Sequence, residues 1–388
     1  MQEIIVSANE AGKRFSKLLS TYLNTAPDSF IYKMLRKKNI KLNGGKADGR
    51  EILKDGDVVK IFLSDETISK FRKNAGYESP AVSDTDRRKD SGDGGNAPSA
   101  EAYGGRDRKI KFDVVYKDDN ILIAYKPAGV LSQKADNGDY SINEAIIDFL
   151  LDNNIITLKS LETFKPSVCN RLDRNTEGLI TAGISLMGSR CLSEIIKDRT
   201  LHKFYYTIVS GKIEKTIDSS AYITKDRKNN KAVVSRDKTP GSEYIHSIFT
   251  PVACNRSYTL VKVELITGKS HQIRAQLKHL GYPLIGDRKY GDKRVNRYFA
   301  DRYGLKNQLL ICGEYVFGDI KNELSYMSGK TSKADFPDHY NRICKDLFYW
   351  QLGIPEAYEV LPWRSLLIIQ MNTIRKRDLL LCRKSPHP

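Results

Sequence analysis

The spacing of apolar residues predicts a small module over residues 1–65. Apolar side chains recur three or four positions apart in two places, which predicts two helices, with Phe15, Leu18, Leu19, Tyr22 and Leu23 in the first and Phe30, Ile31, Met34 and Leu35 in the second. Pro27-Asp28-Ser29 supplies a start signal for the second helix. Short strands are predicted at 40–42, before the turn Asn43-Gly44-Gly45, and at 58–63.

The composition changes sharply after this module. Residues 91–99 and the pair Gly104-Gly105 offer almost no side chain that a hydrophobic core would take up. We therefore predict a flexible linker of mixed charge over residues 66–109. At the other end, residues 326–388 read as a C-terminal extension that finishes in a basic tail, with a short strand or helix at 365–371.

Residues 110–325 are predicted to form the main domain. Apolar runs and alternation predict strands at 121–125, 204–209, 231–236 and 258–266, and helices at 186–197 and 270–280. Strands and helices do not alternate strictly, which favours an α+β core, with a mixed, mainly antiparallel sheet and flanking helices, over a doubly wound parallel fold. No glycine-rich phosphate loop follows a strand, so no nucleotide cofactor is indicated.

The charge balance points toward a polyanionic partner. The chain has 64 Lys and Arg against 47 Asp and Glu, a formal net charge of +17. Nucleic acid is the commonest large polyanion in a cell, and a basic surface that binds nothing is the alternative. No apolar run reaches the length of a membrane span and no secretory signal is present, so we expect a cytoplasmic protein without a membrane partner. The six cysteines are scattered and read as reduced thiols, not as metal ligands.

Three segments contain candidate chemistry. In 169–183, charged and polar residues including Arg171 and Asp173 lie between apolar stretches, which indicates either a reactive site or a capped turn between two strands. In 265–280, Ser270 is predicted to cap a helix that ends at Gly281, with a buried stripe on one face and His271, Arg274 and Lys278 on another. That second face suits an RNA backbone or a carboxylate, whereas a lone His is more often a packing residue.

The third segment is Lys203-Phe204-Tyr205-Tyr206, at the start of a predicted strand. Taken in order, the three segments resemble the RluA-type pseudouridine synthases. The family pattern His-Arg-Leu-Asp-x-x-Thr-Ser-Gly-Leu corresponds to residues 170–179, its Lys-x-Tyr to 203–205, and its Thr-Gly-Arg-Thr-His-Gln-Ile-Arg to 267–274, continuing through 280–287 and Tyr290-Gly291. The resemblance covers about residues 110 to 325.

The N-terminal module is similar to the small S-four-type RNA-binding domain. It carries that domain's opening at 14–19 and its closing Asn43-Gly44 and Gly56-Asp57. The resemblance implies an α-L RNA-binding fold in which cationic side chains contact RNA, namely Arg14, Lys17, Lys33, Arg36 and Lys37. The spacing of the cations on the second helix is equally compatible with a solvated helix face.

The catalytic resemblance implies isomerisation of uridine to pseudouridine in RNA, without cofactor or metal. Asp173 matches the family's nucleophile, Arg274 the Arg that pairs with it and keeps it ionised, and Tyr205 the active-site Tyr that stacks on the base. The target base must leave its stack to be reached. Further RNA contacts are expected from the catalytic domain at Arg171, Lys203, Lys269 and His271.

We expect an active enzyme that acts on large-subunit ribosomal RNA, as a monomer and without a DNA partner. A transfer-RNA substrate, a non-catalytic RNA-binding or ribosome-assembly factor, and another RNA-modifying enzyme such as a methyltransferase are the alternatives; the last is disfavoured because a nucleotide-binding loop is missing. Asn170 stands where the family has His, and Glu177 where it has Ser. We expect these two departures to bear on substrate preference more than on activity.

Overall fold

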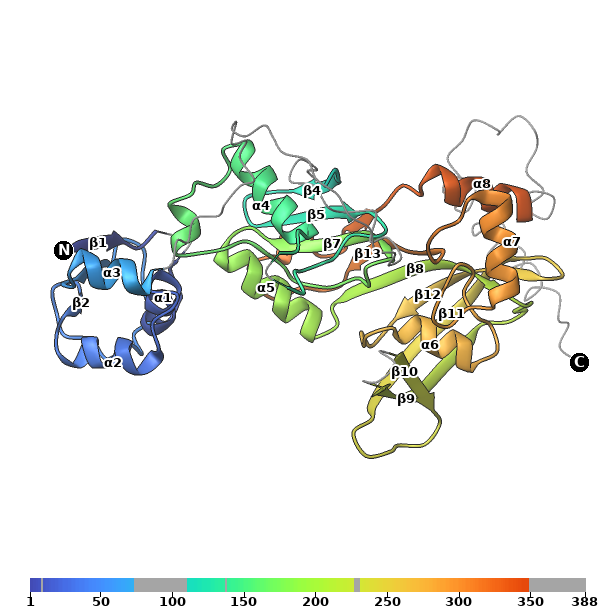
Figure 1. Cartoon of the computed structure of the whole chain (residues 1–388), viewed down its shortest axis with the longest axis horizontal. Helices are drawn as coiled ribbons and strands as arrows, with labels where there is room; N and C mark the ends of the chain where they lie inside the picture. Colours follow the sequence, from blue (N-terminus) through green and yellow to red (C-terminus); the bar gives the residue numbers. More distant parts are fainter. Residues whose placement is uncertain (8–9, 73–109, 137, 227–230, 349–388) are drawn as a thin grey trace, which may run out of the picture. The chain divides into compact units, whose positions relative to one another are not determined.

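The computed structural model describes residues 1–7, 10–72, 110–136, 138–226 and 231–348 (Figure 1). Contacts divide the chain into two compact units. The first comprises Met1–Lys111, Tyr140–Ser167 and Ile184–Leu186, and the second comprises Phe112–Asp139, Val168–Gly183 and Met187–Pro388. The predicted strand or helix at 365–371, the basic tail and the linker from residue 73 onward lie outside the described residues.

The N-terminal module has its own small sheet and core. The antiparallel sheet has the order β1 (Gln2–Ile5), β3 (Val58–Ile61), β2 (Ile40–Leu42). Both predicted helices are confirmed, as α1 (Phe15–Tyr22) and α2 (Asp28–Arg36), and their apolar stripes bury Phe15, Leu18, Leu19, Ile31 and Leu35. The strand β1 was not predicted, because its four residues alternate in burial over too short a length to stand out.

The module extends further than predicted. Residues assigned to the start of the linker belong to helix α3 (Asp65–Phe71), so a flexible linker from residue 66 is wrong. Ser64 caps this helix by accepting a hydrogen bond from the Thr67 backbone N–H (3.3 Å). Ile68 is buried, and the Phe71 ring lies 4.3 Å from that of Phe30. Ile68 and Phe71 therefore pack α3 against the core of the N-terminal module, although the segment around them is polar.

The same unit contains α4 (Ile142–Asp152) and a short 3-10 helix, η1 (Ser160–Glu162). Ser141 and Glu144 form a capping box at the start of α4. The turn after η1 contacts the N-terminal module, because Thr163 bonds to Glu10 and Lys13 through its hydroxyl and carbonyl groups.

The second unit is built on an 11-stranded sheet. Its main order is β10-β9-β11-β12-β8-β13-β7-β5-β4, with β14 paired to β13 and β6 paired to β7. The strands are β4 (Asp113–Lys117), β5 (Ile121–Lys126), β6 (Ser167–Val168), β7 (Glu177–Gly183), β8 (Leu201–Ser210), β9 (Ile217–Asp226), β10 (Lys231–Ser235), β11 (Glu243–Cys254), β12 (Tyr258–Leu265), β13 (Leu310–Phe317) and β14 (Thr331–Lys333). Along the main order, β13 and β7 alone are parallel, so the predicted mainly antiparallel α+β fold is confirmed.

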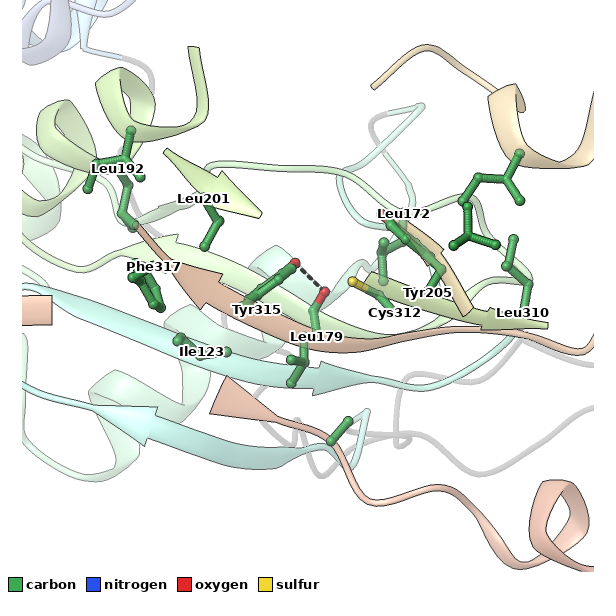
Figure 2. Close-up of a cluster of buried hydrophobic side chains, with 14 of the residues drawn as sticks. Ile123, Leu172, Leu179, Leu192, Leu201, Tyr205, Leu310, Cys312, Tyr315 and Phe317 are labelled. Carbon is green, nitrogen blue, oxygen red and sulfur yellow. Dashed lines mark hydrogen bonds between the residues drawn. The ribbon is translucent and has the colours of Figure 1, made fainter. Parts of the chain in front are cut away.

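Helices pack on this sheet at several places (Figure 1). They are α5 (Leu186–Lys197), α6 (Gln272–His279), α7 (Lys293–Tyr303) and α8 (Asp338–Phe348). The predicted helix at 186–197 matches α5, whose Cys191, Leu192 and Ile195 enter the main core cluster shown in part in Figure 2. Helices α7 and α8 share a second cluster, to which they contribute Phe299 and Tyr340. No helix in the described ranges is long and apolar enough to cross a membrane.

A close approach of two backbones sets the position of β7. Gly178 has φ +111° and pairs with Cys312 in the parallel register between β7 and β13. A Cβ at Gly178 would lie 2.2 Å from the Cys312 carbonyl oxygen, so no larger residue fits. This contact fixes where the loop carrying Asp173 ends and the strand begins.

Candidate active site

Asp173 lies in the loop between β6 and β7, which four hydrogen bonds to three neighbouring residues hold in place. The hydrogen bonds run from Leu172 N to Ser132 Oγ (2.9 Å), from Ser132 Oγ to Leu172 O (2.8 Å), from Gly129 N to Arg174 O (2.9 Å) and from Gln308 Nε2 to Thr176 Oγ1 (2.9 Å). The residues on both sides of Asp173 are therefore anchored. A loop fixed in this way presents its central side chain in one orientation.

Lys126, at the end of β5, is a further anchor of this loop. Its ammonium group donates to three backbone carbonyls, those of Val130 (2.8 Å), Pro127 (3.0 Å) and Arg174 (3.1 Å). The side chain is fully enclosed, and burial lowers the pKa of Lys126 to about 7, against the attraction of Glu177 and Asp173. This role was not predicted from the sequence, although a single Lys that closes an apolar run before a Pro was a visible signal.

Replacing Lys126 with Met is expected to destabilise the fold by roughly 2–4 kcal/mol, because buried carbonyls lose their donor. The substitution should also flatten the pH profile of stability. The pKa of Lys126 in the folded state lies below its ordinary value of 10.5, so the unfolded chain binds more protons between about pH 7 and 10.5 and the wild type gains stability as the pH rises through that window. Chemical denaturation across this range measures the slope.

The exposed Lys117 provides the matched control for this experiment. Lys117→Met should leave the slope of unfolding free energy against pH as it is in the wild type. Superimposable profiles for Lys126→Met and the wild type would contradict the proposed burial of a titrating ammonium group.

The predicted pairing of Arg274 with Asp173 is present in the structure. Arg274 Nη1 donates to Asp173 Oδ2 at 2.7 Å. The opposite side of the guanidinium group is bound by a second carboxylate, Asp287, through Nε (2.6 Å) and Nη2 (2.9 Å). Side-chain exposure is 26% for Asp173, 8% for Arg274 and 0% for Asp287, so the row of charges runs from a partly open carboxylate to a buried one.

Asp287 stays ionised despite its burial. Burial alone pushes its pKa upward, but hydrogen bonds and charge from Arg274, together with the N–H groups of Lys289 and Tyr290, bring the pKa below its ordinary value. The pKa of Arg274 is raised, because the two carboxylates outweigh the effect of burial. The arrangement therefore gives Arg274 a fixed geometry and leaves one of its N–H groups for Asp173.

Tyr290 links Arg274 to His271. The guanidinium carbon lies 5.2 Å from the centre of the Tyr290 ring, and the Tyr290 hydroxyl is 3.0 Å from His271 Nδ1. The same hydroxyl accepts a hydrogen bond from the Ala232 N–H (2.6 Å) on β10. Burial is the main cause that lowers the pKa of His271. The neutral form of the His271 imidazole is therefore favoured near the Asp173–Arg274 pair.

The start of α6 differs from the prediction. Ser270 does not cap the helix; the N-cap position is His271, in the left-handed region with φ 58°. Instead, the buried Gln272 amide ties the preceding turn together, accepting from Thr267 Oγ1 (2.9 Å) and Lys269 N (3.0 Å) while donating to Ser247 Oγ (2.9 Å). A strained residue held by such a network is typical of a functional turn.

Tyr205, on β8, lies at one end of the buried cluster with Leu172, Cys312 and Leu310 (Figure 2). Burial, then the neighbouring Cys312 and then Asp173, raise its pKa well above the ordinary value, so its hydroxyl remains protonated. Asp173 is thus close enough to act on Tyr205 electrostatically. The three predicted catalytic residues are brought together, while their catalytic roles remain predictions.

The two residues that depart from the family pattern, Asn170 and Glu177, both have interaction partners within the fold. Asn170 Oδ1 accepts from the Thr181 N–H (2.8 Å) and hydroxyl (2.9 Å), and its Nδ2 donates to the Tyr315 hydroxyl (2.9 Å). Figure 2 shows the next link, from the Tyr315 hydroxyl to the Leu179 carbonyl (2.6 Å). Glu177 is buried and 3.4 Å from His339 Nε2 on α8. Asn170 thus ties the loop to β7 and β13, and Glu177 links β7 to α8; their effect on substrate preference remains a prediction.

The predicted RNA-contacting residues occupy different environments. Arg14, Lys17, Lys33, Arg36, Lys37 and Arg171 are exposed. Lys269 pairs with Glu243 at the surface, and His271 is half-buried. Lys203 is half-buried beside Cys312, and burial lowers its pKa. Its ammonium group is therefore less available to a phosphate than the other cations.

No group of three potential metal ligands occurs among the described residues. Five cysteines fall in this part of the chain and all are free thiols, while Cys382 lies outside it. The described side chains at the site supply a carboxylate, a guanidinium group, a phenol and an imidazole.

Residues 120–279 match the family model described as RNA pseudouridylate synthase. Over these residues the chain is similar to the RNA pseudouridine synthases, which are isomerases. It is 26% identical, over 85% of its length and 96% of the relative, to an uncharacterized RNA pseudouridine synthase of Mycoplasma capricolum. It is also 26% identical, over 82% of its length and 89% of the relative, to ribosomal large subunit pseudouridine synthase C of Vibrio cholerae.

Among solved structures, the chain is similar to human RNA pseudouridylate synthase domain containing 4. That similarity covers 59% of this chain and 91% of the human one, with a TM-score of 0.45 and 18% sequence identity.

Proposed function

We propose that this protein converts uridines of large-subunit ribosomal RNA to pseudouridine, with Asp173 as the nucleophile. The observation that carries the proposal is the row Asp173–Arg274–Asp287, in which a partly exposed carboxylate is aimed by a guanidinium group that a buried carboxylate holds. A surface ion pair would not need a fully buried second acid. Several relatives are named ribosomal large subunit pseudouridine synthases, which supports the choice of RNA.

The chemistry follows from what a carboxylate can do at a sugar carbon. The Asp173 carboxylate attacks C1′ of the target uridine as the bond from C1′ to N1 breaks, and the uracil leaves with the electron pair. The uracil then turns so that C5 attacks C1′, which releases the carboxylate. The proton leaves C5 and a proton is gained at N1, so the reaction is an isomerisation and needs no cofactor. Tyr205 stacks against the uracil during this turn, with its hydroxyl protonated.

The target uridine must be flipped out of its stack to reach Asp173. Unstacking costs a few kcal/mol, and it costs least in loops and other unpaired RNA. We propose that the N-terminal module binds RNA in the manner of an S-four-type domain. Its exposed Lys33, Arg36 and Lys37 would supply part of the affinity for RNA. We propose that the protein acts as a monomer in the cytoplasm.

Release of tritium tests the proposed reaction directly. Ribosomal RNA labelled with tritium at C5 of uracil loses the label only when C5 forms the new bond, so the purified protein should release tritium from large-subunit RNA. A chain that binds this RNA without releasing tritium from ribosomal or transfer RNA would be a binding or assembly factor. Release from transfer RNA alone would assign the second substrate class.

Removing the positive charges at the end of α2 tests the contribution of the N-terminal module to RNA binding. The triple variant Lys33→Gln, Arg36→Gln, Lys37→Gln should weaken RNA binding and reduce the dependence of log K on log salt by about 2, since each phosphate contact contributes about 0.7 for single-stranded RNA. Binding titrations at several salt concentrations give this slope. An unchanged slope would show that the cationic face of α2 is only solvated.

A further inference from the structure

Helix α7 and the turn before it carry an unusual concentration of positive charge. Residues 288–306 contain seven cationic side chains, Arg288, Lys289, Lys293, Arg294, Arg297, Arg302 and Lys306, against only Asp292 and Asp301. The chain's formal net charge is +17 over 388 residues, so this short segment holds a large part of the excess. No role was predicted for these cations from the sequence.

The first half of α7 presents this charge to solvent. Lys293, Arg294 and Arg297 are exposed, and Phe299 and Tyr303 on the opposite side of the helix are buried in the cluster shared with α8. Within the described chain, none of these three cations forms a salt bridge; Arg302, further along, has its partner Asp346 at 3.9 Å. The exposed cations are thus not committed to acids of the fold.

Two hydrogen bonds attach α7 to the turn that positions Arg274. Asn296 Oδ1 accepts from Gly286 N (2.8 Å), and Asn296 Nδ2 donates to the Asp287 carbonyl (2.9 Å). Asp287 is the buried carboxylate that holds Arg274. Hydrogen bonds therefore connect α7 to the active site, from Asn296 to Asp287 and from Asp287 to Arg274.

Two further cations lie near the active site or the start of α7. Lys289 lies close enough to His271 to lower that residue's pKa, though burial is the main cause. Lys278 is one helical turn beyond Arg274 on α6 and, with Arg294, acts electrostatically on Asp292. The Asp292 carboxylate itself caps α7, accepting from the N–H groups of Arg294 (2.8 Å) and Val295 (3.0 Å).

We infer that a group of five cations, called here the α7 track, binds the phosphate backbone of the RNA strand that flanks the target uridine. The α7 track consists of Lys278, Lys289, Lys293, Arg294 and Arg297. The inference rests on the proposed function, because it places the flanking strand of the same substrate. Four of these side chains are exposed and Lys289 is half-buried. Exposed Lys and Arg side chains fit a polyanion in charge, and such contacts hold the backbone without reading sequence. The two acids that lie between these cations in sequence are both engaged, Asp287 with Arg274 and Asp292 as the cap of α7.

A pair of substitutions that removes two positive charges tests the α7 track. Lys293→Gln with Arg294→Gln, made in the full chain carrying Asp173→Asn to prevent turnover, should lower affinity for a fluorescein-labelled single-stranded RNA of mixed sequence about tenfold. The slope of log K against log salt should fall by about 1.4, the value for two phosphate contacts. Arg302→Gln with Lys306→Gln removes the same charge from the far end of the segment and should leave both quantities close to those of the parent protein.

Two results would overturn the α7 track: an unchanged salt slope in the Lys293/Arg294 variant, or equal losses in both double variants. Tritium release by the chain without substitutions, measured in parallel, separates this inference from the proposed function. If that chain releases tritium but the Lys293/Arg294 variant has an unchanged salt slope, only the α7 track is rejected. If the salt slope falls but the unsubstituted chain releases no tritium, the α7 track is supported and the proposed reaction is rejected.

Discussion

Replacing Asp173 with Asn is expected to lower the rate of pseudouridine formation by at least about a thousandfold, because an amide cannot act as the nucleophile at C1′. The substitution keeps the shape of the side chain and an oxygen that can accept from Arg274 Nη1, now 2.7 Å away. Stability and RNA affinity should therefore change little, since phosphate contacts supply most of the binding. Single-turnover tritium release, together with a binding titration, measures both effects.

Asp198 offers the control for this substitution, because it is an exposed acid just after α5. Asp198→Asn should turn over RNA at the rate of the unaltered chain. Residual turnover by Asp173→Asn close to that of this control would end the assignment of Asp173 as the nucleophile.

Replacing Arg274 with Met is expected to cost about 3–5 kcal/mol of folding stability in addition to activity, because Asp287 would remain as an unpaired buried charge. In the wild type, the pKa of Asp287 is lowered, so its contribution is present above the pKa of the unfolded state and is lost as the pH falls through the folded value. In the variant, protonation relieves the buried charge. The stability deficit of Arg274→Met should therefore be largest near neutral pH and should shrink in acid.

Adding Asp287→Asn to Arg274→Met separates stability from catalysis. The amide oxygen can still accept from the N–H groups of Lys289 (2.8 Å) and Tyr290 (3.1 Å), while the unpaired charge is gone. The double variant should therefore recover much of the stability measured by chemical denaturation, yet stay inactive because Asp173 lacks its partner. Equal stability of the single and double variants would contradict the role assigned to Asp287.

Local patterns predicted the regular elements that have strong periodicity. The apolar spacing of α1, α2 and α5 and the alternation along β12 are strong signals, and these elements are present at nearly the predicted positions. Helix α7 was missed because its apolar stripe consists of only Val295, Phe299 and Tyr303 among charged residues. Strand β11 was missed because Pro251 and a register shift at that point interrupt its alternation.

Only those residues of the candidate site that lie in short, recognisable sequence motifs could be predicted. Asp173, Tyr205 and Arg274 were named from segments whose order resembles a known family. Lys126 and Asp287 were not assigned roles, because their roles depend on partners distant in sequence: Lys126 bonds to the carbonyl of residue 174, and Asp287 binds Arg274 across a turn. Ser270 was wrongly assigned as the helix cap because a buried amide, Gln272, organises that turn through contacts with β11.

The central claim, that Asp173 makes this protein a ribosomal RNA pseudouridine synthase, is tested most directly by mapping pseudouridines in cells. Carbodiimide-stop sequencing of total RNA would be compared between cells with the gene, without it, and without it but carrying either the unaltered gene or Asp173→Asn. We predict that one or more sites in large-subunit RNA disappear on deletion and return only with the unaltered gene. Identical pseudouridine maps with and without the gene, or restoration of the sites by Asp173→Asn, would contradict the account.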